Sequence, residues 1–376
     1  MQTRQPSRPA TEVDALVRRF DWDGINLAEL YFESLHGPGD PARFTPMNDW
    51  VRADAAETLK FDPAELFDED GGRHWRRAPE AWRSFAEYRA RLALDLQKRF
   101  IRRLIEVAPE SDIVVTQIDD RFDTRMREYL GADTAALLPL AEKLDFTVAI
   151  EDPATIWNLG PQRYSEIGRR YRRLTSEHRR LAIDINIVER YQQVYPTRKQ
   201  VGVELFQLVH AASEAFHRVL LYFEHSIGRP DWRLLPHAAA IARFDDSSGI
   251  VKSDLPIGIR HQGAAIVDGK LWPVYDGETV WLPAGEHQVT ASEGAPERSV
   301  LSFTSELLDA SFERESILLR YRSRSRAIAR VNMRPEQISI DGKQFHSTVF
   351  DSKNSHAIML PMGSHTARLS FGALVP

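Results

Sequence analysis

As far as about residue 232, apolar blocks with strand character alternate with long amphipathic helices. Val13, Leu16 and Phe20 fall on one face of a first helix. Pro79 begins a longer helix, in which apolar side chains recur every three or four residues. Each block is followed by a loop and a helix, so the pattern predicts parallel strands joined by helical crossovers, with helices covering the sheet. The blocks span 24–32, 112–119, 146–153, 181–188 and 218–225.

After residue 232 the helical pattern ends and an internal repeat begins. The stretch at 265–292 matches the stretch at 338–371, with an Asp-Gly-Lys turn and an L-P-x-G-x-H segment in each. Asp-Gly turns between alternating runs are typical of β-hairpins. The repeat predicts two tandem β-sandwich modules, similar to the accessory β-domains of carbohydrate-active proteins. His287 and His365 recur at equivalent places, where we expect them to satisfy their turns and not to bind metal.

Composition and charge exclude several classes of protein. The chain has 376 residues, 43% of them hydrophobic and 27% charged, which is enough for two or three domains with real cores. A net charge of -5 with dispersed basic residues argues against a nucleic-acid partner. The absence of Cys excludes disulfides and Cys-ligated zinc. No signal peptide or membrane-spanning stretch is recognised, so we expect the chain to stay where it is made.

The five apolar blocks share a second property, because each turns polar or acidic at its C-terminal end. In a parallel sheet these ends lie on one side. Ala182, Asp184 and Asn186 alternate with isoleucines, so small and polar residues face one way and large aliphatic residues the other, as in a closed barrel with a polar mouth. A single acidic residue at a strand end is more often a turn residue or a helix cap. Five such ends in succession indicate a site.

Convergent carboxylates without clustered histidines suggest hydrolysis of a glycosidic bond or binding of a hard cation. No phosphate-binding glycine motif occurs, and aromatic residues near the strand ends favour a sugar ligand. We expect a poly- or oligosaccharide partner and no cofactor or metal. The candidates for catalysis are Glu29, Glu151 and Asp184. The candidates for substrate binding are Asn26, Tyr31, Asp119, Trp157, Asn186, Tyr222 and Glu224.

The segments "FDWDGINLAELYF" and "HWRRAPEAWRSFAEYRARL" resemble the fourth strand and helix of bacterial (β/α)8-barrel glycoside hydrolases, some of which process exopolysaccharides. The later blocks resemble strands five to eight. The resemblance implies an α/β fold, a partial TIM barrel over 1–232, followed by all-β modules at 233–298 and 299–376. Strands one to three have no counterpart, so we expect self-association or pairing with a missing N-terminal half. A missing part could also place the protein in the periplasm or outside the cell.

Within this resemblance Glu29 is the general acid, its pKa raised by burial near Tyr31 and Phe32. Strand alternation points Glu29 away from the mouth unless the strand is interrupted. Glu151 or Asp184 then serves as nucleophile or base, although Asp184 and Asn186 could instead form a buried hydrogen-bonded pair. A non-catalytic glycan-binding or polysaccharide-assembly protein on a degenerate barrel is the alternative function.

Overall fold

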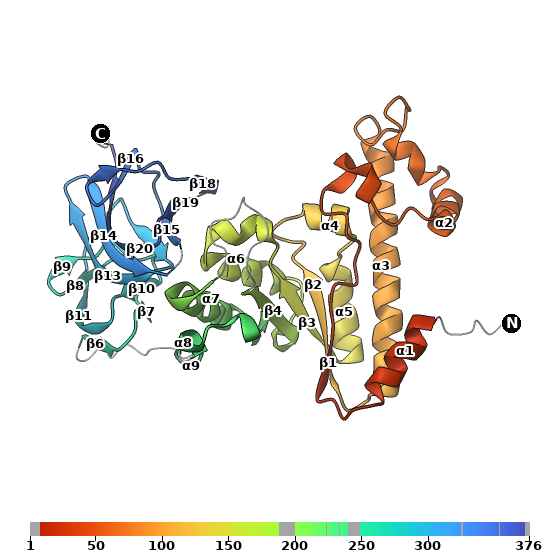
Figure 1. Cartoon of the computed structure of the whole chain (residues 1–376), viewed down its shortest axis with the longest axis horizontal. Coiled ribbons are helices and arrows are strands. Elements are labelled where there is room, and N and C mark those ends of the chain that lie inside the picture. The colour runs from red at the N-terminus through yellow and green to blue at the C-terminus, as the bar shows by residue number, and fades with distance from the viewer. Residues whose placement is uncertain are drawn as a thin grey trace. The chain divides into compact units, whose positions relative to one another are not determined.

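The computed structural model describes residues 8–187, 200–222, 224–232, 234–239, 249–324, 326–352 and 354–372. The five strand blocks predicted before residue 232 all form strands of one sheet, in the order β1-β2-β3-β4-β5. Figure 1 labels the first four of these strands. Pairing is parallel between β1 and β2, β2 and β3, and β3 and β4. The strands are β1 Gly24–Leu27, β2 Asp112–Ile118, β3 Thr147–Glu151, β4 Leu181–Asn186 and β5 Arg218–Tyr222.

The register of these strands separates two kinds of side chain onto the two faces of the sheet. Thr116, Ala149 and Ala182 are partners across β2, β3 and β4, so they lie on the same face. Ala149 and Ala182 form a small buried cluster there with Val114 and Leu220. The neighbouring positions along the strands carry large aliphatic residues, with Gln117 as the polar exception. The prediction of a face with small and polar residues is therefore confirmed for this curled half-barrel sheet.

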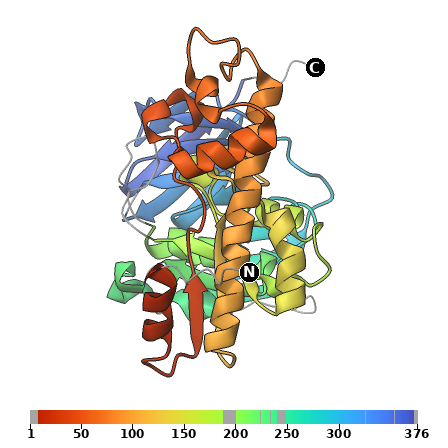
Figure 2. The same ribbon diagram turned by 90° about the vertical axis from the view of Figure 1, so that its right-hand side faces the viewer.

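The helix-covered face of the sheet packs against α3 (Pro79–Val107) and α5 (Thr134–Leu144), which lie side by side (Figures 1 and 2). Pro79 opens α3, as predicted, because its missing N–H falls where a helix has no acceptor for it. Asp133 caps α5 by accepting from the Ala136 N–H at 3.2 Å. The other helices are α1 Arg8–Val17, α2 Asp49–Leu59, α4 Arg125–Leu130, α6 Gln162–Tyr171, α7 Gly202–Ala215, α8 Arg229–Trp232 and α9 Leu234–Ala239.

Arg89, from the middle of α3, fixes the long segment that follows β1. Its side chain is 0% exposed and donates to the carbonyl oxygens of Thr45 (2.6 Å), Glu128 (2.7 Å) and Tyr129 (2.8 Å). The guanidinium carbon also lies 4.2 Å from the centroid of the Phe44 ring. No carboxylate is among these partners, and burial lowers the pKa of Arg89 to about 9. One buried cation thus joins α3, α4 and the segment after β1.

The C-terminal part is antiparallel and contains the predicted repeat. Its sheets have the orders β10-β7, β6-β11-β8-β9, β12-β15-β19-β18 and β13-β14-β20-β16-β17. The first copy comprises β6 Ile250–Ser253, β7 Ile257–Arg260, β8 Ala265–Val267, β9 Lys270–Leu271, β10 Thr279–Leu282 and β11 Gly285–Ala291. The remaining strands are β12 Val300–Phe303, β13 Glu306–Glu313, β14 Ser316–Ser323, β15 Ala327–Val331, β16 Gln337–Ile340, β17 Lys343–Gln344, β18 Val349–Ser352, β19 Ser355–Leu360 and β20 Gly363–Ser370.

The strands of the two matched stretches pair in an equivalent way, and the equivalence continues into the strands before them. The strand that ends each copy, β11 or β20, pairs on one side with the strand before the Asp-Gly turn and on the other with β6 or β14. Equivalent partners are Val289–Val267 with Ala367–Ile340, and Gly285–Ser253 with Gly363–Ser323. One hydrophobic core contains residues of both copies, including Val267, Val289, Leu319 and Leu369. The boundary at residue 298 therefore stays a prediction.

The chain divides into two compact units. The first comprises Met1–Pro153, Ile167–Asp184 and Phe216–Leu220, and the second comprises Ala154–Glu166, Ile185–Ala215 and Leu221–Pro376. Within the described ranges, no helix is both long and apolar enough to cross a membrane.

The repeated Asp-Gly turns are each tied to the histidine of the L-P-x-G-x-H segment. Nδ1 of His287 lies 2.7 Å from Oδ2 of Asp268, and Nδ1 of His365 lies 2.7 Å from Oδ2 of Asp341. Oδ1 of Asp341 accepts from the Thr366 N–H at 2.8 Å. The expectation that these histidines satisfy their turns is confirmed. The hydrogen bond to Asp341 raises the pKa of His365 and lowers that of Asp341.

We expect the free energy of unfolding to depend on pH through His365. Folded His365 holds its proton more tightly than the unfolded chain does, so its contribution is complete below about pH 6.5 and is lost as the pH rises through the folded-state pKa. The difference in urea midpoint between wild type and His365→Gln, measured from about pH 5.5 to about pH 8.5, should shrink with rising pH. A constant difference would contradict the pairing.

Arg89→Met should lower the free energy of unfolding by about 3–5 kcal/mol, because buried carbonyl oxygens lose their donor. Arg91→Met is the matched control, since Arg91 is exposed on the same helix. Urea denaturation followed by tryptophan fluorescence measures both variants. Equal, small losses in the two would show that Arg89 is not the link described above.

Candidate active site

The chain leaves strand geometry directly after β1, and this turns Glu29 out of the strand alternation. β1 ends at Leu27, and Glu29 has a φ of 57°, in the left-handed region that residues other than glycine seldom adopt. Such an interruption is the condition under which Glu29 could reach the mouth. Glu29 is exposed, however, so the predicted burial near Tyr31 and Phe32 is wrong.

Tyr31 follows β1 in the chain, and its side chain reaches the end of β3, which is separated from β1 by β2. Its hydroxyl hydrogen-bonds to Glu151, the last residue of β3. Burial and the charge of Glu151 raise the pKa of Tyr31 far above its ordinary value, and the charges of Glu29 and Glu33 act in the same direction. The ring packs against the cluster that contains Ile118 and Leu130. Tyr31 is therefore a half-buried, protonated donor with carboxylates near it.

The register of β3 and β4 places Asp184 directly beside Glu151. Partners on neighbouring parallel strands point to the same face, so both carboxylates belong to the face that carries Ala149 and Ala182. Asp184 is 7% exposed, and its Oδ1 is buried with no hydrogen-bond partner among the described residues. Burial, with a smaller contribution from the charge of Asp152, raises the pKa of Asp184 to about 6.

The segment that carries Glu29 and Tyr31 is held from two sides. Gln97 of α3 is buried and donates to the Leu30 carbonyl oxygen at 2.9 Å and to Oε1 of Gln117 at 2.9 Å. On the other side the Phe32 N–H donates to the Leu130 carbonyl oxygen at 2.9 Å. These contacts fix the backbone on both sides of Tyr31, while Arg89 holds the chain that follows.

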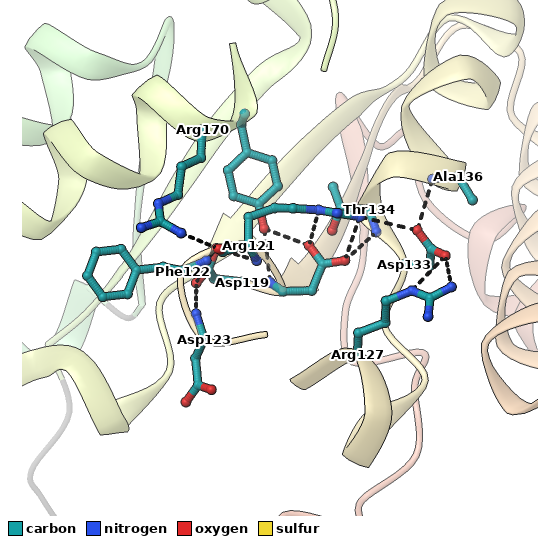
Figure 3. A network of polar contacts seen from close by, with 11 residues as sticks. Asp119, Arg121, Phe122, Asp123, Arg127, Asp133, Thr134, Ala136 and Arg170 are labelled. Carbon is teal, nitrogen blue, oxygen red and sulfur yellow. Dashed lines mark hydrogen bonds and ion pairs between the residues drawn. The ribbon is translucent and has the colours of Figure 1, made fainter. Parts of the chain in front are cut away.

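Asp119 does not have the role predicted for it as a substrate contact. It is 0% exposed, and its carboxylate accepts from the backbone N–H groups of Arg121, Phe122 and Asp123 at 3.0–3.2 Å (Figure 3). These bonds turn the carboxylate back into its own loop. Burial nevertheless raises the pKa of Asp119. Its position after β2 is thus that of a loop-stabilising residue.

Asp120 joins the same loop to α5 and α6. Its Oδ1 accepts from the Tyr171 hydroxyl at 2.9 Å, and its Oδ2 accepts from the Thr134 N–H at 3.0 Å. Nε of Arg121 lies 3.3 Å from Oδ1, and Arg127 pairs with Asp133 at 2.9 Å. The end of β2 is therefore a closed polar network, whereas the ends of β1, β3 and β4 contribute to the candidate site.

The other predicted binding residues differ from one another in exposure and in their contacts. Asn26 is exposed, and its Oδ1 accepts from the Thr116 hydroxyl at 2.9 Å, on the small and polar face of the sheet. Trp157 is 6% exposed and offers no open ring face, while Tyr222 at the end of β5 is 52% exposed. Asn186 is buried at the end of β4. The side chain of Glu224 lies outside the described residues.

Sequence reasoning missed the residues that set the surroundings of the candidates. Asp152 raises the pKa of Asp184, and Gln97 and Arg89 hold the segment around Tyr31. Acidity beside a strand end was a usable signal for Asp152. A glutamine and an arginine within an amphipathic helix gave no such signal. In the described part of the chain, no group of three or more side chains suited to a metal ion comes together.

Comparisons with known proteins identify no family. No family model matches the chain, and no curated protein matches it in sequence. One matching solved structure is the thermostable GH51 alpha-L-arabinofuranosidase from Thermotoga petrophila RKU-1, with 9% sequence identity, a TM-score of 0.22, and coverage of 86% of this chain and 70% of that chain. At that TM-score the likeness carries no argument about activity, so function is argued from the site itself.

Proposed function

We propose that the paired carboxylates of Glu151 and Asp184 hydrolyse a glycosidic bond in a poly- or oligosaccharide. Glycoside hydrolysis needs one carboxylic acid that carries a proton and one carboxylate that does not. The observation that supports the proposal is that Glu151 and Asp184 lie side by side but differ in their burial and hydrogen bonding. Asp184 is buried with a raised pKa, whereas Glu151 is half-buried and receives a hydrogen bond from Tyr31.

In this proposal Asp184 is the general acid. A pKa of about 6 keeps a useful fraction of the carboxyl protonated near neutral pH, where an ordinary aspartate would be ionised. The sequence favoured Glu29 for this role, but the burial that retains a proton is found at Asp184. Glu29 then becomes a third carboxylate near Tyr31, suited to accept hydrogen bonds from sugar hydroxyls.

Glu151 is the nucleophile or base, and Tyr31 positions it. Neighbouring strands lie about 4.8 Å apart, which is close to the carboxylate separation of about 5–5.5 Å in retaining glycosidases. We therefore favour a double displacement with Glu151 as nucleophile. Tyr31 donates a hydrogen bond to Glu151, and its raised pKa keeps the phenol protonated at neutral pH. It therefore stabilises the carboxylate of Glu151 and does not itself act as a nucleophile toward the substrate.

Glu151→Gln and Asp184→Asn should each lower hydrolysis by about 10²–10⁴-fold, because each removes one half of the acid and carboxylate pair. Release of reducing ends from a panel of bacterial exopolysaccharides measures the rate. Glu57→Gln, an exposed carboxylate on α2, is the control and should be unchanged. Wild-type binding without turnover would instead support the non-catalytic glycan-binding alternative.

The rate of hydrolysis should fall as the pH rises through about 6. A general acid acts in its protonated form, so activity is retained below the pKa of Asp184 and declines by about tenfold per pH unit above it. Asp152→Asn removes a like charge and should move this limb of the pH–rate profile to lower pH. A limb that stays in place in that variant would contradict the assignment of Asp184.

A further inference from the structure

A groove of about 620 Å³ lies in the C-terminal β region, within the second compact unit. The first repeat copy contributes β9, and the second contributes the hairpin of β13 and β14. A volume of this size is typical of sites for small ligands. The lining residues are Lys270, Leu271, Pro296, Glu297, Arg298, Ser311, Phe312, Arg314 and Glu315.

Three cations line the groove without ion-pair partners. Lys270, Arg298 and Arg314 each lack a carboxylate within ion-pair distance in the described ranges of the chain. Several other arginines of the same region are paired, as Arg322 is with Glu306 at 2.7 Å, although Arg320 is exposed and has no ion pair among the described residues. Arg334 with Asp351 (2.5 Å) and Arg368 with Glu313 (2.8 Å) are two further ion pairs of this region. The three cations share the lining with two carboxylates, Glu297 and Glu315, so the lining carries a net charge of +1.

Arg298 is the most constrained of the three cations. Its Nη2 donates to the Gly372 carbonyl oxygen at 3.2 Å, and its guanidinium carbon lies 5.7 Å from the Phe371 ring centroid. Its Nε is buried and has no hydrogen-bond acceptor among the described residues. A buried donor of this kind normally has a partner. A held guanidinium with donors to spare is suited to a carboxylate.

Arg314 occupies a turn position where glycine is the usual residue. It lies between β13 and β14 with a φ of 50° and an exposed side chain. The left-handed conformation costs a non-glycine residue about 1 kcal/mol or more. Arg314 lines the groove and supplies a positive charge there, which glycine at this position would not.

Apolar side chains complete the lining. Phe312 and Pro296 are half-buried, and Leu271 is 38% exposed. Flat apolar surfaces of this kind pack against the apolar face of a sugar ring. Glu297 and Glu315 are exposed and can accept hydrogen bonds from hydroxyl groups.

We propose that this groove binds an acidic oligosaccharide whose carboxylates pair with Arg298, Arg314 and Lys270. The choice of a sugar over another anion rests on the proposed function, whereas the preference for negative charge rests on the groove alone. The bound chain would be an anchoring segment of the polysaccharide and would not take part in bond cleavage.

Binding of oligogalacturonides to the full chain, measured by isothermal titration calorimetry, tests the proposal. Wild type should bind oligogalacturonides, and its affinity for neutral cello-oligosaccharides should be at least about tenfold lower. Added salt should lower the affinity for the acidic ligand and leave the affinity for the neutral one unchanged. Arg314→Gly is the informative variant, because it relieves the left-handed φ while removing the cation. It should fold at least as stably as wild type and lose at least about tenfold in affinity.

Arg334→Gln is the matched control, since this arginine is paired with Asp351 and does not line the groove. An equal loss in Arg334→Gln, no binding by wild type, or equal affinity for inorganic phosphate would each overturn the proposal. The double variant Glu151→Gln, Asp184→Asn should keep full affinity. If wild type binds oligogalacturonides yet cleaves no glycan, the groove proposal stands and the hydrolase proposal fails.

Discussion

In-register parallel pairing of β3 with β4 is the constraint from which the candidate site follows. It places Glu151 beside Asp184, and the burial of Asp184 then makes the two carboxylates unequal. Burial, with a smaller contribution from the charge of Asp152, raises the pKa of Asp184, so Asp184 retains its proton more readily than an ordinary aspartate. Tyr31 adds to this difference because it donates to Glu151. Backbone register thus brings the two carboxylates together, and the burial of Asp184 favours the state in which Asp184 carries the proton and Glu151 is ionised.

The approach of Tyr31 to β3 depends on packing that is distant in sequence. Gln97 binds the Leu30 carbonyl oxygen, and Arg89 binds the chain on both sides of Phe44 and the end of α4. A buried guanidinium that meets only uncharged oxygens is costly to desolvate, as its lowered pKa reflects. Several hydrogen bonds and the stacking on Phe44 offset this cost. The result is a segment after β1 that two side chains of α3, Gln97 and Arg89, hold in place.

Features that recur along the chain, such as strand alternation and the repeated turns, could be predicted from the sequence. Contacts made by single side chains could not. Alternation in 181–188 and the succession of strand blocks indicated the strands and their faces, and the Asp-Gly turns indicated the repeat. The sequence placed His365 in its turn but did not identify Asp341 as its partner. It could not show that Asp119 turns back into its loop, because that depends on the fold of the residues after it. Nor could it show that Glu29 is exposed. The groove cations lie apart in the chain, and the packing of β9 against β13, strands of two different sheets, brings them together.

Carboxyl-carbon NMR of the full chain, labelled at aspartate and assigned with Asp184→Asn, is the most direct test of the paired-carboxylate site, because it needs no substrate. We predict that Asp184 titrates near pH 6 and that Asp152→Asn moves this midpoint downward. A midpoint for Asp184 near the ordinary aspartate value of about 3.9, unchanged by Asp152→Asn, would contradict it.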